Sequence, residues 1–168
     1  DITHVHIKQS LNGLEVVNAT ANFNLLDGKV FSMGNRLVNG MAQKSNSSSP
    51  SITPQEAIER AAEQLGINGL QDLKIIDALS SISYVFGKAG ISLEDIPVVL
   101  VYQCIEKEEL RLAWDLSINT MDGQNWWSVR VDAETGMIIS KDNWTAHCDF
   151  DGCARSDKSE TSALASGE

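Results

Sequence analysis

The sequence lacks the motifs by which most enzymes are recognised. It contains no His-Glu-x-x-His, no Gly-x-Ser-x-Gly, no phosphate-binding loop and no Gly-x-Gly-x-x-Gly. Basic residues are scarce, with 13 Lys and Arg against 23 Asp and Glu and a formal net charge of −10. Nucleic acid and anionic membrane surfaces both require clustered basic side chains, so the composition favours neither as a partner. No apolar run approaches the roughly 18–20 residues that a membrane span needs.

Cysteine is also scarce. Cys104 follows the strand-like run VVLVYQ and is most simply interpreted as a buried thiol. Cys148 and Cys153 lie in a polar, Gly-containing tail, where they either stay reduced or close a small disulfide loop in an oxidising compartment. His147 precedes Cys148, but no second spaced pair of ligands accompanies them, so we predict no metal site in this chain.

The residues that are present predict a globular, secreted protein. A chain of 168 residues with 42% hydrophobic residues can build one domain or two small ones. It does not begin with Met and opens directly on a strand pattern, so we expect an N-terminal truncation. Sequons at Asn18, Asn46 and Asn143 fit a secretory route. We expect Asn46, in a Ser-rich loop, to be the most accessible and Asn18, inside a strand-like run, to be structural.

The first part of the chain alternates apolar and polar residues. Turn signals at Asn12-Gly13 and Asp27-Gly28 divide residues 4–38 into three strands of an antiparallel meander. Residues 39–53 are then rich in Gly, Ser and Asn without periodicity, which is typical of a linker or long loop.

A helix and a second set of strands follow. Thr53 and Glu56 flank Pro54 as in a capping box, and Gly66 supplies a stop, so we predict a helix over 54–65 with one apolar face. The segment 67–97 carries both helical and strand patterns. From residue 98 four strand-like runs, VVLVYQCI, RLAWDLSI, NWWSVRV and MIISKDNW, are joined by hairpin turns. The pattern predicts an α+β fold in which antiparallel sheets pack against the helix.

Few side chains in these elements suggest chemistry. His4 and His6 share one strand face, a spacing that binds metal but more often marks a solvated face. Asp132 lies in the tight turn VDAETG, where Asp typically accepts hydrogen bonds from neighbouring backbone N–H groups. Trp126 and Trp127 are adjacent on a strand, so one should be in the core and the other free for a partner surface.

Two stretches carry a family resemblance. THVHIKQSLNGLEVVNATANFNLLDGKVFSMGN resembles the fungalysin/thermolysin propeptide (FTP) domain, and LRLAWDLSINTMDGQNWWSVRVDAETGMIISKDNW resembles the PepSY-like part that follows it in secreted fungal zinc metalloproteases of the fungalysin family. The resemblance implies a cystatin-like or PepSY-like α+β fold with two small subdomains. The expected divisions are an FTP-like meander at 1–45, a Ser-rich linker at 46–53, a PepSY-like helix and sheet at 54–145, and a processing junction with a flexible tail at 146–168.

The resemblance also implies a function. A prosegment of this kind helps its metalloprotease catalytic domain to fold and blocks the active-site cleft until it is cleaved away. The zinc ion would belong to the protease domain, and this chain would hold no cofactor. The residues expected in the cleft are Asp142, Asn143, Trp144, Thr145, Ala146, His147 and Cys148. Either His147 or Cys148 contacts the zinc, or Trp144 anchors the segment while backbone hydrogen bonds fill the cleft.

Two other interpretations remain open from sequence. The chain is either a piece of a longer protease precursor or a free-standing PepSY-type binding module that acts in trans, for example as a protease inhibitor. An unrelated cystatin-like domain is the third possibility. A downstream His-Glu-x-x-His helix would separate the first interpretation from the second.

Overall fold

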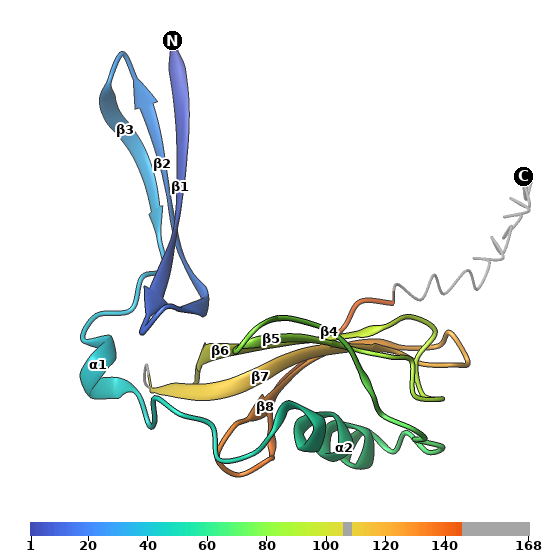
Figure 1. The fold of residues 1–168 in the computed structure, drawn as a ribbon. Helices are drawn as coiled ribbons and strands as arrows, with labels where there is room; N and C mark the ends of the chain where they lie inside the picture. The colour runs from blue at the N-terminus through green and yellow to red at the C-terminus, as the bar shows by residue number, and fades with distance from the viewer. Residues whose placement is uncertain (106–108, 146–168) are drawn as a thin grey trace, which may run out of the picture.

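The computed structural model describes residues 1–105 and 109–145, and these build a sheet-rich molecule. Three antiparallel strands stand upright as an arm: β1 (Ile2–Leu11), β2 (Leu14–Leu26) and β3 (Lys29–Asn35). The arm rises from a broad, nearly horizontal sheet, which we call the body, on the side opposite the long helix (Figure 1). Both arm turns have two consecutive residues of positive φ, Asn12-Gly13 and Asp27-Gly28, as type I′ hairpin turns require. The meander predicted from the sequence is therefore confirmed.

The arm and the body are joined through one strand. The first part of β2 runs parallel to the end of β6, with Val16 opposite Tyr102 and Val17 opposite Gln103. Leu14 and Val16 are buried in the body's core. At Asn18 the backbone adopts φ 63°, and beyond this residue β2 pairs only with the other arm strands. The left-handed residue thus marks the point where β2 leaves the body.

The body is a six-stranded antiparallel sheet in chain order. Its strands are β4 (Ile75–Ser80), β5 (Ser83–Phe86), β6 (Ile96–Cys104), β7 (Leu110–Asn119), β8 (Trp126–Asp132) and β9 (Ile138–Asn143). The last four match the four strand-like runs. The ambiguous segment 67–97 contains the two short strands β4 and β5, which form an edge hairpin.

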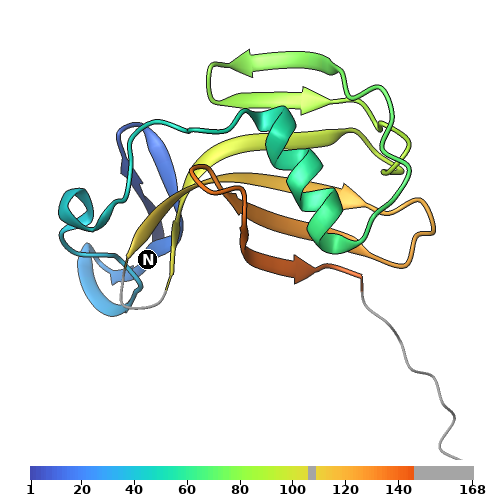
Figure 2. The ribbon, with the colours of Figure 1, turned by 90° about the horizontal axis from the view of Figure 1, so that it is seen from below.

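One helix covers one face of this sheet. Helix α2 (Pro54–Leu65) begins with the predicted capping box between Thr53 and Glu56 and ends at Gly66, whose φ is 71°. It lies diagonally across the strands when the molecule is seen from below (Figure 2). Its Ala57, Ile58, Ala61 and Ala62 are buried against alternate residues of β6, β7 and β8, including Trp114. No helix of the described residues lies on the other face of the sheet, which is called the open face below.

The predicted linker is a closely held loop. It contains the single-turn helix α1 (Met41–Lys44), which the composition did not predict. Ser45 then forms a parallel bridge with Leu110, and the N–H groups of Ser51 and Ile52 donate to the Ala133 carbonyl. Backbone hydrogen bonds therefore fasten this Ser-rich stretch to β7 and to the turn after β8.

Candidate functional site

The end of β9 is fixed by an interlocking set of contacts. Trp144 packs edge-on against Trp126, with ring centroids 5.7 Å apart. The backbone N–H of Trp144 also donates to the backbone carbonyl of Trp126. The Asn143 side-chain oxygen accepts from the N–H groups of Trp126 and Thr145, at 3.1 Å each. Its amide nitrogen donates to Asn125 Oδ1 at 2.8 Å. The chain therefore leaves the body in a direction set by Asn143 and Trp144.

A chain of ion pairs crosses the open face towards this end of β9. Arg130 on β8 contacts Asp115 on β7 through Nε at 3.1 Å and Asp142 on β9 through a terminal nitrogen at 3.0 Å. Arg130 is directly opposite Asp115 in the β7–β8 register. Burial raises the pKa of the Asp115 carboxyl. The positive charge of Arg130 opposes this rise, and the negative charge of Glu15 adds to it. The arginine therefore ties Asp142, the first residue of the predicted inhibitory segment, to the body.

A groove runs along the open face between the base of the arm and the end of β9. Its larger part, about 470 Å³, lies beneath the arm and is lined by Lys8 and Glu15 together with Val99, Asp115 and Arg130. A smaller hollow of about 140 Å³ shares the last three residues and reaches Trp144. The two hollows are neighbours, since these three residues line both. The groove contains ion pairs and valines, and no nucleophile–base pair lines it.

The turn that drew attention in the sequence is structural. Asp132 is fully buried, and its Oδ1 accepts from the N–H groups of Glu134 and Thr135 at 2.9 and 2.8 Å. The Arg111 Nε lies 3.0 Å from Oδ2, an ion pair without the direction of a good hydrogen bond. Gly136 closes the turn with φ 75° and donates to the Asp132 carbonyl. This arrangement matches the sequence-based expectation for Asp132.

The sequons differ from the expected order of accessibility. Asn46 is half-buried, because its Oδ1 accepts from the Leu112 N–H and its Nδ2 donates to Glu134. Asn18 and Asn143 are exposed. The prediction that Asn46 is the most accessible sequon is therefore wrong, since the Ser-rich loop is held against β7. Glycosylation of all three remains a prediction.

Several predicted residues are not gathered into one site. His4 and His6 lie on the arm, and the His4 ring is 2.6 Å from Asn24 Oδ1. Within residues 1–105 and 109–145, no group of three or more His, Cys, Asp or Glu is arranged to hold a metal. Cys104 is half-buried, with Sγ 3.6 Å from the Ile105 carbonyl. Ala146, His147, Cys148 and Cys153, and with them the predicted disulfide and tail, lie outside the described residues.

The adjacent tryptophans divide as predicted. Trp127 packs against the core on the helix side, with the Lys141 ammonium 5.6 Å from its ring centroid. Trp126 is on the open face against Trp144. The ion pairs around Arg130 were missed, although charged residues at alternate positions of three neighbouring strands were a visible signal. In the part of the chain that the structure describes, no helix is long and apolar enough to cross a membrane.

Comparison with known proteins shows that this chain is similar to part of several fungal extracellular metalloproteinases. Residues 2–37 match the Fungalysin/Thermolysin Propeptide Motif. Over 146 residues the chain is 33% identical to "Extracellular metalloproteinase mep" of Aspergillus fumigatus, and over 147 residues it is 32% identical to "Extracellular metalloproteinase 9" of Coccidioides posadasii. Each alignment covers 82% of this chain and 22% of the relative. This chain thus spans about a fifth of the length of the curated relatives it matches.

The resemblance inferred from the two sequence stretches is confirmed by these matches. The first stretch falls within the propeptide motif, and the alignments extend well past it. Among solved structures, the Bacillus megaterium YpeB C-terminal domain aligns with 86% of this chain and 52% of its own length, at 10% identity and a TM-score of 0.45.

Proposed function

We propose that this chain is a folded prosegment of an extracellular zinc metalloprotease, which assists folding of the protease domain and blocks its cleft until cleavage. The observation that carries the proposal is the propeptide motif at 2–37 within an alignment to extracellular metalloproteinases. Under this proposal the chain acts outside the cell, its partner is the cognate catalytic domain, and the zinc belongs to that partner. The arm is the FTP-like unit, and residues 54–145 are the PepSY-like unit.

The geometry at the end of β9 supports a defined route into the cleft. An inhibitory segment is most effective when it is held in place before binding, because less conformational freedom is then lost. Asn143 and Trp144 are fixed on Trp126, and Asp142 is held by Arg130. We therefore assign Trp144 the role of an anchor and the following residues, to Cys148, the role of occupying the cleft.

The test is an inhibition titration with the purified catalytic domain of the cognate protease. The full chain should inhibit peptide hydrolysis saturably with a submicromolar Kd, which corresponds to about 8 kcal/mol or more. A chain ending at Thr145 keeps the anchor and lacks residues 146–168, which include the segment Ala146–Cys148, and it should inhibit much more weakly. A chain ending at Asn143 removes the anchor as well. Equal inhibition by all three would remove the segment from the mechanism, and no inhibition by a folded full chain would overturn the proposal.

A further inference from the structure

One face of the arm is apolar and uncovered. Strand register places Val5, Phe23 and Met33 in one row across the three strands, and Leu25 beside Val30 in the next. Ile7 opposes Ala21 on the same face. We call this the arm's apolar face, made of Val5, Ile7, Phe23, Leu25, Val30 and Met33. Exposure is 39% for Val5, 40% for Ile7, 55% for Val30 and 58% for Met33.

The opposite face of the arm is polar except at its tip, where the paired Ile2 and Leu26 are exposed. His4 contacts Asn24, which in turn donates to Ser32. At the base Lys8 is opposite Thr20, and both line the groove over the body. The polar face thus adjoins the groove at the base of the arm, and the apolar face is its reverse side. This is the inverse of a sheet that is packed on its own domain, whose apolar side would be covered.

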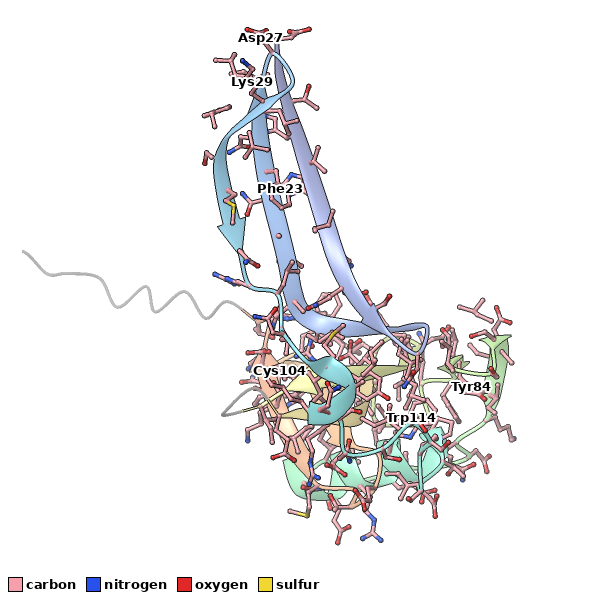
Figure 3. The ribbon with its side chains drawn as sticks, turned by 90° about the vertical axis from the view of Figure 1, so that its left-hand side faces the viewer. Phe23, Asp27, Lys29, Tyr84, Cys104 and Trp114 are labelled. Atoms are coloured by element: carbon pink, nitrogen blue, oxygen red, sulfur yellow. The ribbon has the colours of Figure 1, made fainter. Side chains whose placement is uncertain are left out.

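No described part of the chain covers the apolar face. The contacts described between arm and body lie near the base of the arm, where Val16 and Val17 pair with β6, Leu14 packs in the core and Asn12 donates to the Tyr102 hydroxyl. Phe23 lies half-way up the arm, far from Trp114 and Tyr84 in the body (Figure 3). Contiguous apolar surface on a soluble protein commonly marks an interaction site. The face is therefore a candidate interaction site for a partner outside the described residues.

We propose that the arm's apolar face is a docking surface for the metalloprotease catalytic domain, an inference that rests on the proposed function. The propeptide motif at 2–37 coincides with the arm and is found here in a chain related to much longer metalloproteinases. None of the six residues of the face is charged, so the partner must offer an uncharged, apolar surface.

Charge argues against a second copy of this chain as the occupant. The chain carries a net charge of −10, whereas the motif region 2–37 has three basic and two acidic residues. Self-association would bring two strongly acidic bodies together, and their repulsion opposes a contact that contains no compensating charge. A protease domain without this excess charge can bury the face at lower electrostatic cost.

Methionine oxidation tests the inference in the unmodified chain. Met33 on the arm, Met121 and Met137 have nearly equal exposures of 58%, 56% and 58%. Met121 and Met137 line hollows that also contain residues of α2 or of its C-terminal end. Their oxidation rates therefore measure the accessibility of the helix-covered side of the body. We expect a saturating catalytic domain to slow Met33 oxidation by peroxide at least about tenfold and to change Met121 and Met137 by less than about twofold. Unchanged Met33 oxidation in an inhibited complex would overturn the inference while leaving the prosegment function intact.

A variant pair supplies the energetic test. Met33→Lys places a charge on the apolar face, and Ser32→Lys places the same charge on the polar face of the same strand. Met33→Lys should weaken binding to the catalytic domain at least about tenfold, and Ser32→Lys should stay within about threefold. Far-UV circular dichroism checks that both variants are folded. If either variant is unfolded, the oxidation measurement on the unmodified chain decides the inference.

The same measurements separate the other outcomes. If the wild-type chain neither binds nor inhibits the catalytic domain, the prosegment proposal fails and the docking surface with it. If Met33 becomes protected when the chain alone is concentrated, with a dimer in sedimentation velocity, the occupant is a second copy and the inference is wrong.

Discussion

At the scale of the residue, two carboxylates, the buried Asp132 and the half-buried Asp115, organise the open face and the turn beside it. Asp132 satisfies two backbone N–H groups and faces Arg111 in a site closed to solvent. Asp115 shares Arg130 with Asp142 and is only partly withdrawn from water. Neither residue has a reactive partner, so their chemistry stabilises the scaffold that positions Asn143 and Trp144.

Removal of the Asp132 carboxylate should be costly. Asp132→Ala leaves two turn N–H groups without their acceptor and removes the buried ion-pair partner of Arg111, and we expect a loss of about 3 kcal/mol in unfolding free energy. Glu134→Ala in the same turn is the control, because Glu134 is exposed and bonds only the Asn46 side chain in the described contacts. Urea denaturation of both variants measures the difference. Similar losses would show that Asp132 has no special role.

Asp115 should give the protein a specific pH dependence. Its pKa is raised in the folded state by burial, so the folded chain binds this proton more tightly than the unfolded chain. Its contribution to stability is therefore present at low pH and is lost as the pH rises through the folded pKa. The unfolding free energy of wild type minus that of Asp115→Asn should fall between pH 4 and pH 7, as followed by urea denaturation at each pH. A rise over this range would contradict the assignment and indicate that Arg130 outweighs burial.

At the scale of the element, periodicity and turn chemistry determine most of the fold. Asn12-Gly13 and Asp27-Gly28 fix the arm, and Thr53 with Glu56 begins α2, since these signals act within a few residues. The segment around β4 was ambiguous because it is an edge strand with two register shifts, and its Ile75, Ile76 and Leu79 are all exposed. The strand β4 therefore shows no alternation of buried and exposed residues. The position of the loop 45–52 depends on hydrogen bonds to distant residues, which local sequence does not encode.

Strand β8 offers a direct test of the two faces. Trp127→Ala removes a half-buried ring from the core side, and we expect a loss of about 2 kcal/mol, below the roughly 3–5 kcal/mol of a fully buried aromatic. Trp126→Ala removes only the edge-on contact with Trp144, and we expect a loss of about 1 kcal/mol or less. Thermal and urea unfolding compare the two. Inhibition should respond in the opposite order, because only Trp126 supports the anchor.

At the scale of the whole molecule, the arm and the body differ in how they are stabilised. The body has a core between α2 and the sheet, including the fully buried Tyr102 and Ile118. Along the arm above Asn18, the only buried residues in β1–β3 are Ala19 and Ala21. A three-stranded sheet with one uncovered apolar face has little to hold it closed beyond its backbone hydrogen bonds. The sequence predicted the three strands of the arm and the last four strands of the body, but not this difference, because pairing partners and coverage are tertiary properties.

This difference predicts that the arm opens without the body. Backbone amides of β1 and β3 should exchange hydrogen at least roughly 100-fold faster than those in the centres of β6 and β7, since Leu11 at the base is the only residue of these two strands that packs against the core. Mass spectrometry of peptides covering 2–11 and 96–104 measures both in one sample. Docking of the catalytic domain on the apolar face should slow exchange in the arm selectively, because opening then also requires dissociation. Equal protection of the two regions in the free chain would mean that arm and body unfold as one unit. The exposure of the arm's apolar face would then not indicate a missing partner.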